Sequence, residues 1–410
     1  MRFGFAMHGS RGDVQPGVAV ARALADRGHE VTVAAPEDIV PAVSRTGLPT
    51  RVLCPDNSEL LKSPLVKERL KSKNPSTRLK ALAEISAFGA ETSEQVMGEL
   101  AQGADVLVTG LLAQERAATV AESTGTAFVP LHYCPIRSNE SVEIFRPMPT
   151  WTRRAMWALG DQVNWLTVRG RDRDLRRRLG IAPATGPLPR RLRAAGTPEV
   201  QAYDPLMFPG LREEWGPSRP FTGALLPDEA TRRQYNDDDG QATAGVVTWA
   251  DSDRPPVYVG FGSMPVEPER IEGIVGSLTG LGLRVIAHTE HELPPADAVL
   301  RVSAPIDHET LLPHCRGAVH HGGAGTTAAV ARAGVPAVIG WLSADQPMWA
   351  AALRRLGVGG GRRLRKLDED DLTLLLDDEV ADSAARLAER LTPPASAVAG
   401  ACDVLLAAAS

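Results

Sequence analysis

The chain has 410 residues, of which 43% are hydrophobic and 23% charged, and it carries a net charge of −5. This length suits two domains of about 200 residues each rather than a single domain. The near balance of 45 Lys and Arg against 50 Asp and Glu excludes an overall electrostatic attraction to nucleic acid. No apolar run approaches the roughly 20 residues of a membrane span, so we expect no stable membrane insertion.

Four cysteines, Cys54, Cys134, Cys315 and Cys402, are scattered without the spacing of a metal or redox site. Reduced thiols of this kind are typical of a cytoplasmic protein, and we expect that location. The apolar start at residues 1–8 is too short for a signal peptide and predicts a first buried strand instead.

The first half of the chain alternates strand signals with helix signals. Apolar runs predict strands at residues 2–7, 30–35, 105–109 and 127–131, and periodic segments predict helices at 16–27 and 113–123. A strand–helix–strand pattern implies a parallel sheet covered by helices. We therefore assign residues 1–215 to an N-terminal Rossmann-like α/β domain.

A second alternation begins at residue 254, after a Pro-, Asp- and Gly-rich interdomain linker at residues 216–253. Residues 254–392 predict a second Rossmann-like domain, and 393–410 a C-terminal helix that packs back on the first domain. Two such domains facing each other define a cleft, in which ligands bind at the carboxyl ends of the strands. The Asp-x-Asp at 237–239 lies in the linker, and we interpret it as a solvated acidic loop rather than a metal site.

The most informative motif is His-His-Gly-Gly-Ala-Gly-Thr-Thr at residues 320–327. It follows a short apolar strand and opens a helix, so bare backbone N–H groups and the helix dipole meet at the glycine turn. Phosphate is the usual ligand of such a turn. The two histidines add imidazoles that are able to donate to a diphosphate, which favours a binding role over a merely tight β–α connection.

The same loop also matches a dinucleotide-binding fingerprint. Gly323, Gly325 and Ala328 form G-x-G-x-x-A, and Asp345 follows about 20 residues after Gly325, as a ribose-binding acid would. An NAD(P)-dependent oxidoreductase is therefore an alternative interpretation. Against it, the fingerprint normally opens the first βαβ unit of a domain, and the histidines have no role in that scheme.

Two other loops in the second half place polar residues at the ends of predicted strands. Gly262 and Ser263 close one strand, and Asp345 and Gln346 follow another. An adjacent carboxylate and amide suit vicinal hydroxyls, because the carboxylate accepts hydrogen bonds while the amide both donates and accepts. The alternative for this pair is a turn followed by a helix N-cap.

In the first half, His8-Gly-Ser-Arg-Gly-Asp13 joins the first strand to the first helix. Asp13 is either the N-cap of that helix or a carboxylate at the cleft that takes a proton from an acceptor hydroxyl. A carboxylate is a weak base toward an alcohol, which suits displacement at an activated, oxocarbenium-like sugar carbon. Arg11 beside it is placed to neutralise phosphate charge or is solvated.

With these residues in place, the chain resembles the inverting family 1 glycosyltransferases of the GT-B type, in the branch of vancomycin-type antibiotic and sterol glycosyltransferases. Four segments carry the resemblance: 9–16, 259–264, 320–327 and 345–347. It implies metal-independent transfer of a sugar from a TDP- or UDP-sugar to a hydroxyl of a small-molecule acceptor, with no further cofactor. We expect a monomer or weak homodimer.

The resemblance also implies roles for individual residues. Asp13 is the expected general base, whereas many relatives have a histidine in the equivalent loop. We expect the donor diphosphate at Arg11, Gly262, Ser263, His321, Gly323, Gly325 and Thr326, the donor sugar at Asp345 and Gln346, the nucleobase at Val302 and Ile306, and the acceptor at Ser10 and His132. Acceptor selectivity is expected from loops within about 55–80 and 132–165. A second alternative is a non-catalytic glycosyltransferase-like partner of another enzyme.

Overall fold

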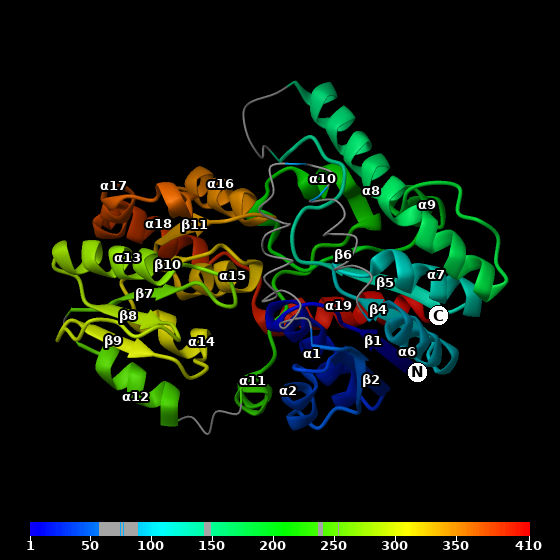
Figure 1. Ribbon diagram of the computed structural model, residues 1–410, viewed down its shortest axis with the longest axis horizontal. Helices are drawn as coiled ribbons and strands as arrows, with labels where there is room; N and C mark the ends of the chain where they lie inside the picture. The colour runs from blue at the N-terminus through cyan, green and yellow to red at the C-terminus, as the bar shows by residue number, and fades with distance from the viewer. Residues whose placement is uncertain (57–73, 75–76, 78–88, 143–148, 237–240, 253) are drawn as a thin grey trace.

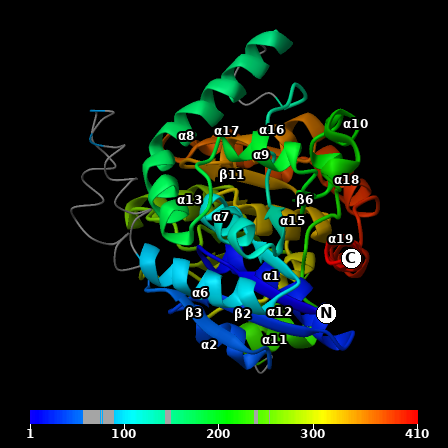
Figure 2. The same ribbon diagram turned by 90° about the vertical axis from the view of Figure 1, so that its right-hand side faces the viewer.

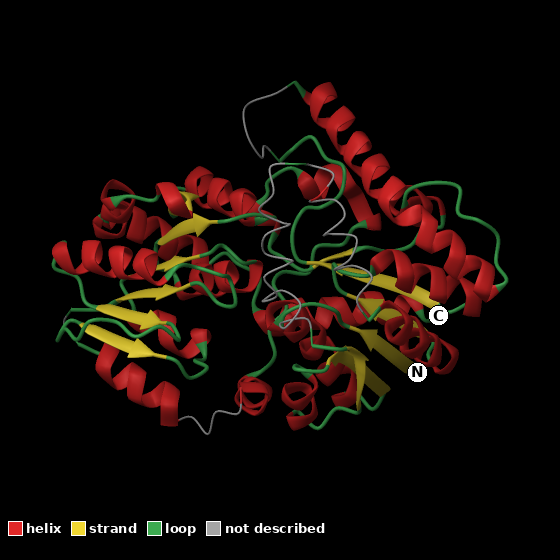
Figure 3. Cartoon of the chain, in the orientation of Figure 1, coloured by secondary structure: helices red, strands yellow, loops and turns green. Residues whose placement is uncertain are grey.

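The computed structural model describes residues 1–56, 74, 77, 89–142, 149–236, 241–252 and 254–410. Two parallel six-stranded sheets lie in separate halves of the molecule, and helices cover both faces of each sheet (Figures 1 and 3). The first sheet has the order β3-β2-β1-β4-β5-β6, and the second has β12-β11-β10-β7-β8-β9. Both are the doubly wound Rossmann order, so the predicted α/β fold with two Rossmann-like domains is confirmed.

The strands are short and mostly buried. Those of the first sheet are β1 (Arg2–Ala6), β2 (Glu30–Pro36), β3 (Thr50–Cys54), β4 (Val106–Thr109), β5 (Ala127–His132) and β6 (Val200–Gln201). Those of the second are β7 (Val257–Gly260), β8 (Val285–His288), β9 (Val299–Val302), β10 (Gly317–His320), β11 (Ala337–Trp341) and β12 (Gly359–Arg363).

The helices alternate with these strands along the chain. In the first half they are α1 (Arg11–Asp26), α2 (Val40–Arg45), α6 (Ala90–Gly103), α7 (Gln114–Thr124), α8 (Thr150–Leu179), α9 (Leu188–Ala194) and α10 (Leu211–Trp215). They continue with α11 (Glu229–Asn236), α12 (Gln241–Ala250), α13 (Pro268–Gly280), α14 (His308–Leu311), α15 (Ala324–Ala333), α16 (Gln346–Leu356), α17 (Glu369–Thr373), α18 (Asp378–Ala388) and α19 (Pro394–Ala408). Short 3-10 turns lie at Pro205–Met207, Gly216–Ser218, Leu312–His314, Leu364–Lys366 and Leu374–Leu376.

Side-chain alternation along the strands builds two cores around each sheet. In β1, Phe3 and Phe5 pack with α1 and α19, whereas Ala6 packs with α6 and α7 on the other face. In β7, Val257 and Val259 pack against α13 and α17, whereas Tyr258 faces α12, α14 and α15. Burial on both faces explains why these strands are nearly continuous apolar runs in the sequence.

Helix α1 begins at Arg11, five residues before the start at residue 16 that the sequence predicts. Its N-cap is Ser10, and Asp13 lies at the third helical position, where its side chain accepts from the Ser10 N–H. This arrangement is a capping box, which replaces the predicted N-cap role of Asp13. Pro16 lies inside the helix rather than at its start.

The segment 216–253, which we expected to be a linker, contains two helices that pack on different halves. Helix α11 lies on α2, where Arg45 donates to the carbonyls of Gln234 and Tyr235 at 3.0 and 3.1 Å. Helix α12 lies on α14, and Val246 is buried in the core of the second half. Residues 237–240 between them, which include the Asp-x-Asp at 237–239, lie outside the described part of the chain.

The C-terminal helix α19 crosses back to the first half and packs against α1, as Figures 1 and 2 show. Ala397, Ala401 and Leu405 are buried there in the same core as Phe3 and Phe5. Within the described residues, no helix has both the length and the apolar character needed to cross a bilayer.

Candidate active site

The candidate site lies where the strand order of each parallel sheet reverses, between the strand that starts the sheet and the strand added on its other side. In the first sheet β1 lies beside β4, and in the second β7 lies beside β10, so the loops after β1, β7 and β10 leave the sheets at their switch points. Ligands of doubly wound folds bind outside the carboxyl ends of strands at this position. The predicted loops at residues 8–13, 261–263 and 321–323 are these three loops.

His321 is held between two glycines at the end of β10. A Cβ at Gly323 would lie 2.5 Å from Nε2 of His321, and one at Gly262 would lie 3.4 Å from Cε1, so the close approach requires glycine at position 323. Burial lowers the pKa of His321 to about 4, although a hydrogen bond to the backbone of Gly260 opposes this shift. The imidazole is therefore neutral near pH 7. Its position and its neutral state suit hydrogen bonding to a phosphate oxygen.

His320 has a different role from its neighbour. Its side chain is completely buried, and Nδ1 accepts a hydrogen bond from the Gly322 N–H at 3.1 Å. Gly322 has φ of +87°, and a Cβ there would lie 2.6 Å from the side chain of Ile339, so this turn requires glycine. His320 thus fixes the turn that presents His321.

The first turn of α15 presents unobstructed backbone. Gly323 is the N-cap, and at Gly325 an added Cβ would meet nothing within 4 Å. Thr326 follows in the same turn, while the exposed Ser263 lies after β7, the strand that pairs with β10. The N–H groups of a helix start stabilise negative charge, so the region bounded by the ends of β7 and β10 is suited to an anion.

Asp345 and Gln346 follow β11 and begin α16. Oδ2 of Asp345 accepts a hydrogen bond from the Trp349 indole at 2.8 Å, and burial raises the pKa of this carboxyl above its ordinary value. Oε1 of Gln346 accepts from the backbone N–H groups of Leu342 and Ser343 at 2.7 and 3.1 Å. The Gln346 oxygen therefore stabilises the loop, while its amide nitrogen donates to Sδ of Met264 at 3.9 Å, a weak acceptor.

Asp13 lies beside the backbone of Gly9. A Cβ at Gly9 would lie 2.5 Å from Oδ2 of Asp13, and Gly9 has φ of +117°. Oδ2 accepts from both the backbone N–H and the hydroxyl of Ser10, each at 2.8 Å. Burial raises the pKa of Asp13, the hydrogen bonds from Ser10 lower it, and the charge of Asp345 raises it. The carboxylate is thus more basic than a free aspartate.

Arg11 points toward the interdomain segment rather than toward the glycine loop. Its guanidinium donates to the side chain of Asn236 and lies over the ring of Tyr235, 5.1 Å from the centroid. Its positive charge nevertheless lowers the pKa of both His288 and His308, after the larger effect of burial. Arg11 therefore lies close to the end of the second sheet while binding α11.

Three residues at the edge of the site were not predicted from the sequence. The hydroxyl of Tyr258 lies 3.0 Å from Nδ1 of His288 and 2.7 Å from Nε2 of His308. His288 also hydrogen-bonds the backbone of Ala304, in the segment between Val302 and Ile306 that we assigned to the nucleobase. The placement of His288 at the carboxyl end of β8 is the signal that would have revealed it.

His132 is buried in a polar network. It ends β5, is fully buried, and its ring nitrogens contact Gln201, Arg137 and Gln114. Burial, and then the charge of Arg137, holds its pKa well below the ordinary value. An acceptor has no access to this imidazole in the structure, whereas Ser10 is exposed.

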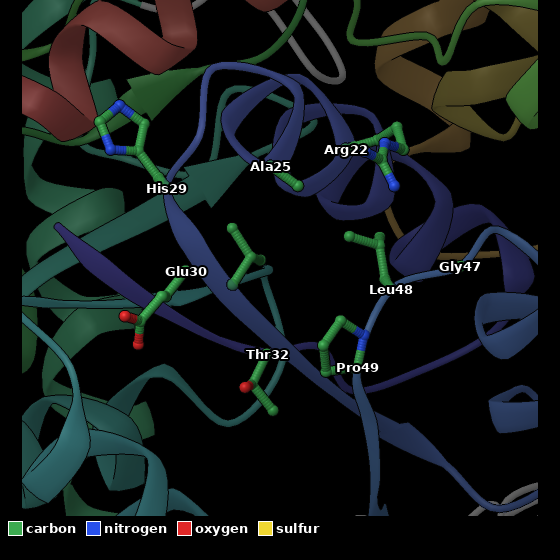
Figure 4. A pocket seen from close by; sticks show the side chains of 9 residues that line it. Arg22, Ala25, His29, Glu30, Thr32, Gly47, Leu48 and Pro49 are labelled. Atoms are coloured by element: carbon green, nitrogen blue, oxygen red, sulfur yellow. The ribbon is translucent and has the colours of Figure 1, made fainter.

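A surface pocket on the first half lies away from this site (Figure 4). Glu30 at the start of β2, His29 and Leu48 line it, so it lies at the amino end of that strand. Parallel α/β sheets bind ligands at the opposite edge, and the pocket therefore adds no candidate chemistry. In the described part of the chain, no group of three or more His, Cys, Asp or Glu side chains is arranged for a metal ion.

Comparison with known proteins assigns this geometry to a family. Residues 3–113 match the glycosyltransferase family 28 N-terminal domain, and 280–402 match the erythromycin biosynthesis protein CIII-like C-terminal domain. An uncharacterized glycosyltransferase of Mycobacterium bovis is 37% identical over 99% of this chain and 98% of its own length. The chain belongs to the antibiotic-type family 1 glycosyltransferases.

A further relative and a solved structure match the chain over nearly its whole length. The O-mycaminosyltylonolide 6-deoxyallosyltransferase of Streptomyces fradiae is 30% identical over 95% of this chain and 93% of its own length. The crystal structure of glycosyltransferase VinC in complex with dTDP superposes with a TM-score of 0.65 at 18% identity, covering 100% of this chain and 99% of that chain.

The enzyme is thus a GT-B glycosyltransferase that uses a nucleotide-sugar donor. The predicted glycosyltransferase class is confirmed, and the comparisons give no support to the oxidoreductase alternative or to a non-catalytic partner. The fold explains why the fingerprint was misleading, because the G-x-G-x-x-A loop follows β10, the fourth strand of its sheet, and not β7.

Proposed function

We propose that the enzyme transfers a sugar, with inversion, from a TDP- or UDP-sugar to a hydroxyl of a small-molecule acceptor, and that Asp13 is the general base. The observation that carries this proposal is the approach of Asp13 and Asp345 from different halves. Asp13 lies in the first turn of α1, after β1, and Asp345 is the N-cap of α16, after β11. The Tyr133 hydroxyl donates to the Asp13 carbonyl at 2.9 Å, the adjacent Cys134 thiol donates to Asp345, and the charge of Asp345 raises the pKa of Asp13. Direct transfer of a sugar from donor to acceptor needs two groups. One half supplies the base for the acceptor hydroxyl, and the other supplies a carboxylate that binds hydroxyls of the donor sugar.

The donor end of the proposed site is an anion site. The α15 N-terminus with Gly323, Gly325 and Thr326, together with neutral His321 and Ser263, hydrogen-bonds the diphosphate. As the bond between the sugar C1 and the phosphate oxygen breaks, negative charge accumulates on the leaving diphosphate. Prealigned N–H donors stabilise that charge more in the transition state than in the ground state.

The acceptor end supplies the base. The acceptor oxygen forms the new bond to C1 on the face opposite the leaving group, and its proton passes to Asp13. Because attack and departure occur on opposite faces in one displacement, the configuration at C1 inverts. Burial raises the basicity of Asp13, and the Ser10 hydrogen bonds keep its carboxylate oriented.

The sugar and nucleobase contacts complete the proposal. Asp345 and the Gln346 amide hydrogen-bond sugar hydroxyls, and the segment from Val302 to Ile306, held by His288, contacts the base. Ser10 is the proposed acceptor contact. The dTDP complex of VinC supports a thymidine diphosphate donor among the two candidates, and the O-mycaminosyltylonolide 6-deoxyallosyltransferase of Streptomyces fradiae supports a natural-product acceptor.

We further propose that residues 1–215 bind the acceptor and residues 254–392 the nucleotide sugar, in a cytoplasmic enzyme that needs no metal ion. Much of the expected acceptor loop 55–80 lies outside the described residues. The packing of α11 on α2 supports a division between domains after Asn236, within the segment 216–253 that we expected to be the linker.

Binding and transfer assays test this proposal. Titration with TDP, UDP, their glucose conjugates and NAD(H) should show micromolar binding of at least one nucleoside diphosphate and none of NAD(H). The preferred donor, incubated with a panel of macrolide, sterol and polyphenol acceptors in the presence of EDTA, should yield a glycoside. Stabilisation by NAD(H) alone would contradict the proposed donor, and dependence on added metal would contradict the metal-independent mechanism.

A further inference from the structure

Trp349 connects the donor half of the molecule to the acceptor half. It lies on α16 and is 2% exposed, in a core that also contains residues from the chain after β6. Its ring packs edge-on against Phe208, with the centroids 5.1 Å apart, and against Tyr203, with the centroids 6.2 Å apart. Because Tyr203 and Phe208 follow β6 of the first sheet, the position of this indole depends on how the two halves pack.

Neighbouring polar contacts hold the same interface. Arg355 of α16 donates to the carbonyl of Met207, and the Thr392 N–H donates to Oδ2 of Asp204 at 2.7 Å. Both contacts join the second half to the segment 204–207. The aromatic core is therefore flanked by hydrogen bonds that restrict sliding of one half on the other.

The indole N–H of Trp349 binds the carboxylate assigned to the sugar. The Nε1–Oδ2 distance to Asp345 is 2.8 Å, which is a good hydrogen bond. The loop before it is tightly constrained, because Ala344 has φ of +57° and Gln346 accepts from two backbone N–H groups of that loop. Strained residues of this kind persist where the surrounding structure fixes them, often at binding sites.

The first half also reaches this carboxylate directly. Cys134, just after β5, is 1% exposed, belongs to the same core as Trp349, and its thiol acts as a hydrogen-bond donor to Asp345. A thiol is a weak donor, so sugar hydroxyls displace it readily, whereas the indole N–H is the stronger partner. Asp345 therefore has one partner from each half of the molecule.

We propose that Trp349 is a positioning residue that couples the packing of the two halves to recognition of the donor sugar, by orienting Asp345 through its indole N–H while Phe208 and Tyr203 fix its ring. This inference rests on the proposed sugar contact of Asp345. Donor recognition then has two parts. The diphosphate binds the loops after β7 and β10, whereas binding of the sugar by Asp345 depends on the aromatic core between the two halves.

The measured quantity is the ratio of two dissociation constants, that of the nucleotide sugar over that of the matching nucleoside diphosphate. Trp349→Phe keeps an aromatic ring and removes the N–H, and it should raise this ratio about tenfold, because one oriented hydrogen bond to a charged group is lost. Phe208→Leu removes a ring that lies outside the assigned sugar contacts, and it should raise the ratio about threefold. The Kd of TDP or UDP alone should change less than twofold in both variants.

Trp215→Phe is the matched control. Trp215 belongs to the same core and is 7% exposed, but its indole donates to the carbonyl of Ser138 at 3.0 Å and not to the sugar site. This variant should lose thermal stability as Trp349→Phe does, with the ratio unchanged. A general structural role would shift both Kd values equally in every variant.

Two outcomes contradict the inference separately from the proposed function. If Trp349→Phe folds, binds the nucleoside diphosphate normally and shows an unchanged ratio, Trp349 does not position Asp345. If Phe208→Leu leaves the ratio unchanged while Trp349→Phe raises it, the coupling to the first half is wrong. If the unmodified enzyme binds neither TDP nor UDP, the proposed function fails, and the inference fails with it.

Discussion

Asp13 and Asp345 lie in different halves of the molecule, yet the negative charge of Asp345 raises the pKa of Asp13. Asp13 lies in the first turn of α1, after β1, and Asp345 follows β11, so this interaction exists only because the two halves bring these segments together. The loops after β7 and β10 lie on the Asp345 side and form the proposed anion site. The proposed site thus combines residues from both halves. Proton removal by Asp13, the effect of Asp345 on its pKa, and binding of the diphosphate are each testable separately.

Replacement of the proposed base should abolish transfer without affecting donor binding. Asp13→Asn keeps the hydrogen bonds with Ser10 but removes the proton acceptor, and general base catalysis typically contributes about 10²- to 10⁴-fold. The turnover number should fall by at least about 100-fold, measured with the best donor and acceptor. Asp26→Asn, at the exposed end of the same helix, should leave the rate within twofold of the unmodified enzyme. A rate within a few-fold of normal for Asp13→Asn would show that another group takes the proton.

The pH dependence of transfer should show an acidic limb that Asp345 shifts. A base is active when deprotonated, so a raised pKa of Asp13 places the fall in rate above the range of an ordinary aspartate. Asp345→Asn removes a neighbouring negative charge, which lowers the pKa of Asp13 and moves the limb to lower pH. The turnover number at saturating donor, measured between pH 4 and 8, reports this shift. A limb that moves to higher pH, or does not move, would contradict the interaction.

Removal of the His321 imidazole should weaken diphosphate binding. His321→Ala deletes one hydrogen-bond donor to a charged group, an effect worth about 1.5–3 kcal/mol. The Kd of TDP or UDP should therefore rise by about 10- to 100-fold in calorimetric titration. His314→Ala is the control, because its side chain is 36% exposed and contacts Asp251. Equal affinities in His321→Ala and His314→Ala would remove His321 from the phosphate site.

The buried histidines should make the fold sensitive to acid. Burial, followed by the charge of His288, lowers the pKa of His308 from 6.5 to about 4. Between these values the unfolded chain binds a proton that the folded chain does not, so stability falls as the pH drops from about 6.5 toward 4. This single group should cost about 1–2 kcal/mol between pH 7 and pH 5.

The variant that isolates this effect is His308→Gln, because glutamine does not titrate and still reaches the Tyr258 hydroxyl. Its free energy of unfolding, measured by urea denaturation at pH 7 and pH 5, should decrease less than that of the unmodified enzyme. An equal or larger decrease in His308→Gln would show that His308 does not account for acid sensitivity.

The sequence revealed the architecture because burial on both sheet faces makes the strands continuous apolar runs. Residues such as Val257 and Phe5 belong to runs of this kind, and glycine loops mark where they end. Strand β12 is harder to predict. Its sequence Gly-Gly-Gly-Arg-Arg has low strand propensity, and Gly359 is there because a Cβ would lie 2.2 Å from the Ala337 carbonyl of the neighbouring strand. Only the tertiary contact explains that choice.

Among the site residues, too, some are predictable from a local motif and others depend on tertiary contacts. Local motifs predicted His321, Asp13 and Asp345, because each lies where a strand is followed by a helix: His321 and Asp345 in the connection, and Asp13 in the first helical turn. The partners of these residues come from distant parts of the chain, and no local pattern marks them. Trp349 and Phe208 illustrate this difference, since their contact depends on the packing of two halves that no local pattern specifies.

The anomeric configuration of the product tests the central claim most directly. With an α-linked donor such as TDP-glucose or UDP-glucose, proton NMR of the purified glycoside should show a β linkage, because the acceptor attacks C1 opposite the diphosphate while Asp13 takes its proton. The β product should form at a rate that depends on Asp13. An α-linked product would contradict a single displacement assisted by Asp13, and with it the assignment of the two halves of this site.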